Sequence, residues 1–133
     1  MPAYNFQARF APKVLDGSKR STIRGRAAKV GSTAYLFTGM RTKACQRLGR
    51  GEIIHCAPIT LGYDHESEPF ATLLDDVLDE AAFNQLAIDD GFDCPRAMLA
   101  WFKTTYDTAT PVVHADGSRI VFKGFLITWV TAK

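Results

Sequence analysis

The sequence predicts an α+β fold, namely a small antiparallel β-barrel with two to three short helices. Five or six short stretches carry the alternation, β-branched content or turn signals of strands. Two stretches with helical spacing follow late in the chain. The length of 133 residues suits one domain and is too short for two ordinary ones. Residues 1–133 are therefore expected to form a single domain, although periodicity does not distinguish one small barrel from another.

The amino-terminal part is expected to hold two strands with a short helix between them. Apolar and polar residues alternate over Tyr4–Phe10, which is typical of a half-buried strand. Pro12 suits a first helical turn and Gly17 suits a left-handed end, so Pro12–Asp16 should form one or two turns. The hydroxyl-rich, β-branched run Ser21–Arg24 then indicates a strand.

The middle of the chain is expected to be mostly strand. Ala34–Thr38 has the composition of a central strand, and the basic, glycine-flanked segment Gly39–Arg50 is either a loop or a hairpin arm. Glu52–Leu61 indicates a long apolar strand in which Pro58 predicts a bulge or an edge. A short strand over Phe70–Leu74 follows.

Two helices are expected next. Asp79 suits the N-cap of a helix that ends at Gly91. A second helix should begin with Asp93 or Cys94 as its cap and Pro95 in its first turn. Its apolar face comprises Met98, Leu99, Trp101, Phe102 and Tyr106. Trp101 could stack on a base, but its helical spacing favours a place in the core.

A hairpin and a buried strand are expected to complete the fold. Asp116 and Gly117 form a turn signal between Val112–Val113 and Ile120–Phe122. The run Gly124–Trp129 has the pattern of a buried strand.

The composition is that of a folded, soluble protein, with 47% hydrophobic and 23% charged residues. No apolar run approaches the roughly 20 residues that span a bilayer, and no signal-peptide core is visible at the amino terminus. We therefore expect a cytoplasmic protein without a membrane partner, as a monomer or a weak dimer. The three cysteines and three histidines form no metal-ligand spacing, so neither a metal nor another cofactor is expected.

Charge is distributed unevenly along the chain. Residues 13–50 contain ten basic side chains and one acid, whereas residues 64–93 contain ten acids and no lysine or arginine. This asymmetry indicates either a basic surface for a phosphate-bearing partner or two halves that neutralise each other. Arg41 and Lys43 are the side chains expected nearest an incoming phosphate.

The stretch from Gly17 to Arg24 holds the residues best suited to chemistry. On a strand, Thr22 and Arg24 share one face, and Lys19 can approach Thr22 only if the chain turns between them. An ammonium beside a hydroxyl and a guanidinium suits binding an anion, polarising a carbonyl or activating an oxygen nucleophile. The alternative is a solvated hairpin with basic edge residues.

This stretch also resembles the signature of ASCH domains, the activating signal cointegrator homology family, and especially its small bacterial N4-acetylcytidine amidohydrolases. The resemblance runs without a gap from Phe6 to Arg24, and weaker similarity occurs at Asp90–Phe92 and in the closing strand. The residues that carry the main match are Phe6, Arg9, Phe10, Leu15, Gly17, Lys19, Thr22 and Arg24; those in the closing half are Asp90, Gly91, Phe92, Phe122, Gly124, Ile127 and Trp129.

The resemblance implies a PUA-like barrel in which a lysine, a threonine and an acid perform the chemistry, here Lys19, Thr22 and Asp90. The family's acid is typically a glutamate, whereas this chain has the shorter aspartate. Amide hydrolysis needs a partly desolvated lysine, because an ordinary lysine is protonated at neutral pH. Asp90 at a helix C-terminus should have a raised pKa, as a general acid requires. The expected substrate-binding residues are Arg24, Phe6 and Arg41.

The expected function is therefore metal-independent removal of the acyl group from N4-acetylcytidine or a related nucleoside. Two alternatives remain open at this point. One is a non-catalytic RNA-binding module, since PUA-like barrels commonly serve that role and the basic stretch suits a nucleic-acid backbone. The other is weak ribonuclease activity from the same lysine and acid.

Overall fold

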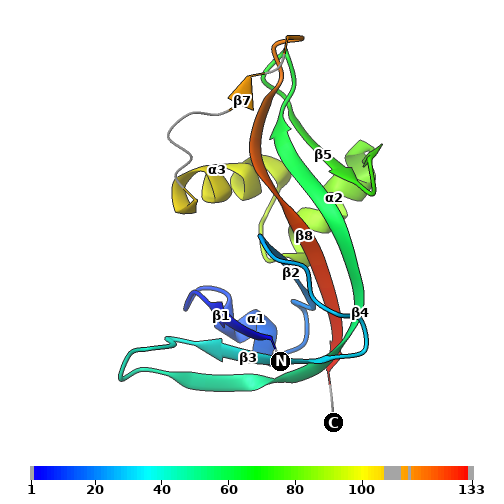
Figure 1. Ribbon diagram of the computed structural model, residues 1–133. Coiled ribbons are helices and arrows are strands. Elements are labelled where there is room, and N and C mark those ends of the chain that lie inside the picture. Colours follow the sequence, from blue (N-terminus) through cyan, green and yellow to red (C-terminus); the bar gives the residue numbers. More distant parts are fainter. Residues whose placement is uncertain (1, 107–111, 114, 132–133) are drawn as a thin grey trace.

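The computed structural model describes residues 2–106, 112–113 and 115–131 of the chain (Figure 1). It is an α+β structure with a mostly antiparallel sheet and three short helices. In chain order the elements are β1 (Ala3–Phe6), α1 (Ala11–Leu15), β2 (Ser21–Arg24), β3 (Thr33–Thr38), β4 (Gln46–Tyr63), β5 (Pro69–Leu73), β6 (Asp76–Val77), α2 (Glu80–Asp89), α3 (Pro95–Thr105), β7 (Val112–Val113) and β8 (Arg119–Thr131).

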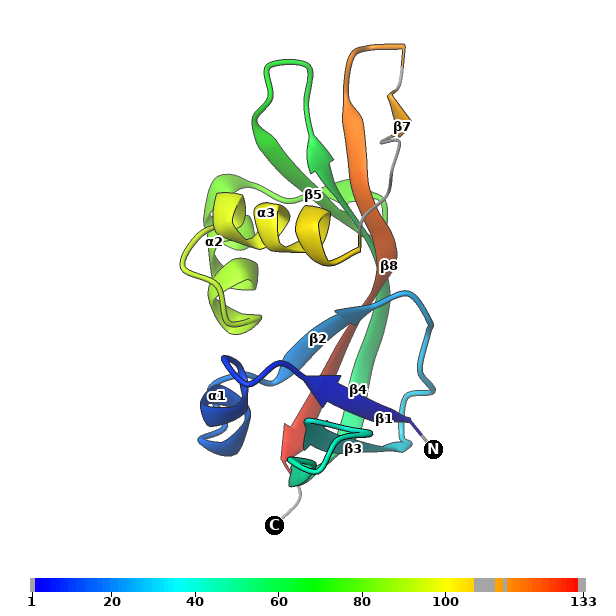
Figure 2. The same cartoon turned by 90° about the vertical axis from the view of Figure 1, so that its left-hand side faces the viewer.

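The two longest strands, β4 and β8, run side by side through the length of the molecule as an antiparallel ribbon (Figure 1). One edge of β4 pairs with β3 near one end and with β5 near the other. The second edge of β8 pairs with β2 and with β7. All three helices lie on one side of this ribbon (Figure 2). Its fully buried side chains include Ile53, Leu61, Ile127 and Trp129, so the ribbon supplies much of the core.

The pairings leave the sheet open in the described part of the chain. The sheet follows the order β1-β3-β4-β5-β6, and β8 connects β2 and β7 to β4. β1 and β2 end two different branches and do not pair with each other, so the expected small barrel is not confirmed. One pair, β1 with β3, is parallel rather than antiparallel.

The first predicted strand is longer than the observed one. It was expected over Tyr4–Phe10, but β1 ends at Phe6 and the chain then turns, with the backbone N–H of Phe10 donating to the carbonyl of Gln7 at 2.9 Å. Phe10 is nevertheless buried. The apolar–polar alternation extended to Phe10 because this side chain packs in the core, and not because the backbone is extended there. The predicted helix and the strand Ser21–Arg24 are confirmed as α1 and β2.

The basic segment Gly39–Arg50 is a hairpin arm, because its second half belongs to β4, which pairs with β3. Pro58 lies between the parts of β4 that pair with β3 and with β5. On that edge it pairs with no strand in the described residues, although its carbonyl accepts the backbone N–H of Leu74, just after β5, at 3.1 Å. Pro58 therefore lies inside a central strand rather than on an edge strand. The register shifts of β4 occur elsewhere, between Ile53 and His55 and near Leu61.

Both predicted helices are confirmed. The Asp79 side chain caps α2 by accepting the backbone N–H of Ala82 at 2.8 Å. Gly91 follows the helix with φ of +96°, which is the left-handed conformation that glycine adopts readily. α3 begins at Pro95 and buries Met98, Leu99 and Phe102, whereas Trp101 is only half-buried.

The predicted hairpin around Asp116 and Gly117 is confirmed as β7 and β8. The short hairpin between β5 and β6 was not predicted. Its turn residues, Leu74 and Asp75, both have positive φ, at 53° and 68°. Leucine is rare in that conformation, so the sequence carries no turn signal there.

Replacing Gly91 should destabilise the fold where α2 ends. In Gly91→Ala the new Cβ would be strained at positive φ and would lie 2.9 Å from Cδ1 of Phe10. A loss of roughly 1–3 kcal/mol in the free energy of unfolding is expected, measured by urea denaturation. Gly25→Ala is the matched control, because its Cβ would meet nothing within 4 Å. Equal stability of the two variants would contradict this account.

Candidate active site

Lys19 is a buried lysine at the entry to β2. Gly17 has φ of +83° and ends α1, and the backbone N–H of Lys19 then donates to the carbonyl of Lys13 at 3.0 Å. The chain thereby turns the side chain inward, where it is only 3% exposed. Its ammonium donates three hydrogen bonds, to the Ser21 carbonyl at 2.9 Å, the Asp90 carbonyl at 2.7 Å and Asp90 Oδ1 at 2.6 Å.

Asp90 occupies the C-cap position of α2 and is also 3% exposed. Gly91 behind it turns the chain, and its carbonyl accepts a hydrogen bond from Lys13 Nζ at 3.1 Å. The adjacent Asp89 points elsewhere, since it is exposed and accepts from Gln85 at 2.8 Å. The two neighbouring acids therefore have different environments, and only Asp90 contacts Lys19.

Burial sets the electrostatics of the Lys19–Asp90 pair. It lowers the pKa of Lys19, against the attraction of the Asp90 carboxylate, and raises the pKa of Asp90, against the attraction of the Lys19 ammonium. The expected upward shift for Asp90 is thus reproduced, with burial rather than the helix end as its main cause. Both shifts favour a neutral amine and a carboxylic acid. That state differs from the ion pair by the movement of one proton between Lys19 Nζ and Asp90 Oδ1, which are 2.6 Å apart.

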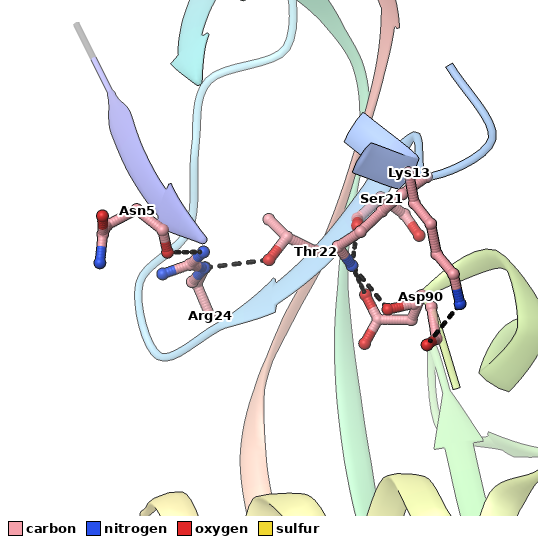
Figure 3. A network of polar contacts seen from close by, with 8 residues as sticks. Asn5, Lys13, Ser21, Thr22, Arg24 and Asp90 are labelled. Carbon is pink, nitrogen blue, oxygen red and sulfur yellow. Dashed lines mark hydrogen bonds and ion pairs between the residues drawn. The ribbon is translucent and has the colours of Figure 1, made fainter. Parts of the chain in front are cut away.

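Thr22 and Arg24 lie on the same face of β2, as predicted (Figure 3). Arg24 Nε donates to the hydroxyl oxygen of Thr22 at 3.0 Å, and Arg24 Nη2 donates to the carbonyl of Asn5 at 3.0 Å. The guanidinium carbon also lies 5.2 Å from the ring centroid of Phe6. Arg24 is therefore held between β1 and β2, and its positive charge faces the Thr22 oxygen.

These side chains line one cavity of about 190 Å³. β1 and β2 form two of its walls, and α3 with the segment after α2 forms the others. Trp101 contributes an aromatic wall, and its ring lies 5.7 Å from that of Phe10. The lining residues are Asn5, Phe6, Gln7, Phe10, Lys19, Thr22, Ile23, Arg24, Asp90, Phe92, Trp101, Phe102, Thr105 and Tyr106. The cavity thus joins a polar, titratable end to an aromatic surface.

Five of the six predicted site residues meet in this cavity: Lys19, Thr22, Asp90, Arg24 and Phe6. Arg41 does not line it, because it lies exposed in the turn between β3 and β4. Within the described residues no hydrogen bond joins Lys19 to Thr22, although both face the same space. The predicted approach of these two side chains is therefore only partial.

The sequence prediction missed several lining residues. Asn5 and Gln7 gave no signal, because single exposed amides in a strand pattern are common. Trp101 and Tyr106 were assigned to the core by their helical spacing, yet both are half-buried and line the cavity. Spacing identifies the face of a helix but not whether a cavity interrupts the core beneath it.

The charge asymmetry is not neutralised through ion pairs. Among the described residues one ion pair, Lys19–Asp90, joins the basic stretch 13–50 to the acidic stretch 64–93. Arg41, Lys43, Arg47 and Arg50 on the hairpin arm are all exposed. The basic arm is therefore available to a partner.

Removing the lysine should destabilise the protein in a pH-dependent way. Lys19→Met leaves a buried carboxylate without its cation. The free energy of unfolding, measured by urea denaturation, should therefore fall by about 3–5 kcal/mol at about pH 8. Folding raises the pKa of Asp90 above its ordinary value of 3.8. Its contribution to stability is therefore complete below that value and is lost as the pH rises through the folded-state pKa. The loss of stability caused by Lys19→Met should therefore be smaller at about pH 5 than at about pH 8.

The double variant Lys19→Met with Asp90→Asn is the control, because it removes both charges. It should be more stable than Lys19→Met alone at about pH 8. Two results would contradict the unpaired Asp90 carboxylate as the cause. One is a stability loss in Lys19→Met that is independent of pH, and the other is a double variant that is less stable than Lys19→Met.

Elsewhere, within residues 2–106, 112–113 and 115–131, no three His, Cys, Asp or Glu side chains lie close enough together to hold a metal ion. Of the helices that the structure describes, none has the length and apolar character needed to cross a membrane. Comparisons of the chain with protein-family models, with curated proteins and with solved structures find no match.

Proposed function

We propose that this protein is an ASCH-type hydrolase with a PUA-like scaffold, which removes the acyl group from the exocyclic nitrogen of N4-acetylcytidine or a related nucleoside. The observation that carries the proposal is the buried Lys19–Asp90 pair, which lies in the same cavity as Thr22 and Arg24. The motif resemblance from Phe6 to Arg24 supports the choice of substrate. The reaction consumes one water and releases a carboxylic acid and cytidine.

Hydrolysis of an amide requires that one proton leaves the attacking oxygen and another reaches the leaving nitrogen. The Lys19–Asp90 pair suits this transfer, because its two protonation states differ by one short proton movement. Asp90 Oδ1 bonds to Lys19, and Asp90 Oδ2 has no hydrogen-bond partner among the described residues. In the proposed reaction a water attacks the acyl carbon as the pair takes its proton. The C–N bond then breaks as the pair gives a proton to N4.

Thr22 serves this reaction best as a hydrogen-bond donor. Its oxygen accepts from Arg24 Nε, so its own proton is free to be donated to the acyl oxygen of the substrate. The nearby guanidinium stabilises the negative charge that develops on that oxygen during attack. The missing hydrogen bond between Lys19 and Thr22 favours water over Thr22 as the nucleophile.

The aromatic part of the cavity supports a planar substrate. Phe6, Phe10, Trp101 and Tyr106 offer ring surfaces beside the polar end. A pyrimidine base can stack on such surfaces, with about 1–3 kcal/mol per stacked base in other proteins. The cavity volume of about 190 Å³ is below the range of roughly 300–1,000 Å³ typical of drug-sized ligands. It therefore suits a base and its acyl group better than a larger molecule.

The test is hydrolysis of N4-acetylcytidine by the purified protein in the presence of a chelator, followed by chromatographic detection of cytidine. Asp90→Asn keeps the shape of the side chain and removes its titrating proton. It should lower the rate by roughly 10²- to 10⁴-fold, the usual contribution of a positioned acid or base.

Asp89→Asn is the matched control for this experiment, because Asp89 is the adjacent acid and is exposed. It should retain the wild-type rate, and circular dichroism should show both variants folded. Absence of turnover by the wild type would refute the hydrolase proposal. Equal activity of Asp90→Asn and the wild type would show that Asp90 is not the acid.

The exposed basic arm supports RNA binding as a second candidate function. Arg41, Lys43, Arg47 and Arg50 project from the β3–β4 hairpin, and the segment Gly39–Arg50 contains no acidic side chain. Because these cations lie away from the cavity lining, a phosphate backbone could bind there without using the active site.

RNA binding through the arm should depend steeply on salt. Reversing two charges in Arg41→Glu with Lys43→Glu should flatten the slope of log affinity against log salt by roughly 0.7 per lost phosphate contact with single-stranded RNA. Fluorescence anisotropy with a labelled oligonucleotide measures the slope. Lys103→Glu with Lys123→Glu reverses two exposed charges elsewhere and should leave it unchanged. Tight, salt-sensitive binding without hydrolysis would favour this function over the first.

A further inference from the structure

Two carboxamides line the active-site cavity but have no role in the chemistry proposed above. Asn5 and Gln7 are both exposed, whereas Lys19 and Asp90 are each only 3% exposed. The two amides therefore lie on the exposed side of the cavity, whereas the titratable pair is buried. Groups on this side would contact a part of a substrate that lies away from the bond being broken at the buried pair.

Trp101 fixes the orientation of the Gln7 amide. The indole Nε1 donates to Gln7 Oε1 at 3.0 Å. An indole N–H can only donate a hydrogen bond, so the carboxamide must present its oxygen to Trp101 and its NH₂ group elsewhere. The contact joins residues 94 positions apart, and it connects the segment after β1 to α3.

The NH₂ group of Gln7 makes no hydrogen bond to any described residue. The amide lies at the edge of the Trp101 ring, where its oxygen accepts the indole N–H, and this ring forms the aromatic wall of the cavity together with Phe10. A flat ring stacked on this wall would present its edge to the amide. Two N–H donors held at that position suit a hydrogen-bond acceptor on the ring edge.

A cytosine ring offers such an acceptor at the required place. When its N4 substituent lies at Lys19 and Asp90, the C2 carbonyl is the ring acceptor most distant from the reacting bond. We propose that Gln7 is a specificity-determining residue, whose NH₂ group donates to the C2 carbonyl of the pyrimidine substrate. This inference rests on the proposed function, since it takes the position of the base from the proposed reaction.

Gln7→Glu separates this role from a merely structural one. The carboxylate can still accept the Trp101 N–H, so the contact between the segment after β1 and α3 is kept, but the two donors are lost. The test compares kcat/KM for N4-acetylcytidine and for N4-acetyl-2-thiocytidine, in which a weakly accepting sulfur replaces the C2 oxygen. The wild type should prefer the oxygen substrate by about tenfold. Gln7→Glu should reduce kcat/KM for N4-acetylcytidine by about tenfold or more and abolish the preference.

Gln46→Glu is the matched control, because it makes the same change at an exposed glutamine outside the cavity lining. It should keep both the wild-type rate and the wild-type preference. If the wild type hydrolyses N4-acetylcytidine and Gln7→Glu keeps its rate and preference, the role of Gln7 is refuted and the hydrolase proposal stands.

Calorimetric titration with cytidine and 2-thiocytidine distinguishes the remaining outcomes. If no hydrolysis occurs but the wild type binds cytidine more tightly than 2-thiocytidine and Gln7→Glu does not, the role of Gln7 stands and the hydrolase proposal fails. If the protein neither hydrolyses nor binds these nucleosides, both proposals are refuted.

Discussion

The buried contact between Lys19 and Asp90 is the constraint on which the site depends. It joins residues that are 71 positions apart and connects the entry of β2 to the end of α2. Burial of two charged groups is costly unless the charges are paired and hydrogen-bonded. Three acceptors surround the lysine nitrogen, and two of them belong to Asp90. The left-handed glycines that follow α1 and α2 place both side chains where these bonds can form.

The unpaired edges of β1 and β2 border the cavity that this contact lines. A closed barrel would pair two such strands and fill the space between them with side chains. Here the bond from Arg24 to the Asn5 carbonyl bridges the two strands, and the cavity is lined from both. The incomplete pairing that distinguishes the sheet from the expected barrel thus coincides with the cavity that lies between these strands.

The sequence predicted best where local chemistry decides the structure. The Asp79 cap, the glycines after both helices and the strand Ser21–Arg24 all depend on a few adjacent residues. The β6 hairpin was missed because Leu74 adopts a conformation that leucine rarely uses. Arg41 was misplaced relative to the cavity because charge along a chain does not say which surface it reaches. The orientation of Gln7 depends on Trp101, a contact too distant in sequence for any local pattern to reveal.

The position of β8 in the chain has a consequence for how the protein is made. β8 pairs with β2, β4 and β7, all of which leave the ribosome before it. Until β8 emerges, β2 lacks its strand partner in the described chain, and the core lacks Ile127 and Trp129. Local hairpins among the earlier strands can form before β8 is made, but the long-range pairings of β8 can form only after it has emerged. β2 also lines the cavity that holds Lys19 and Asp90, so this wall of the cavity gains its strand partner only when β8 pairs.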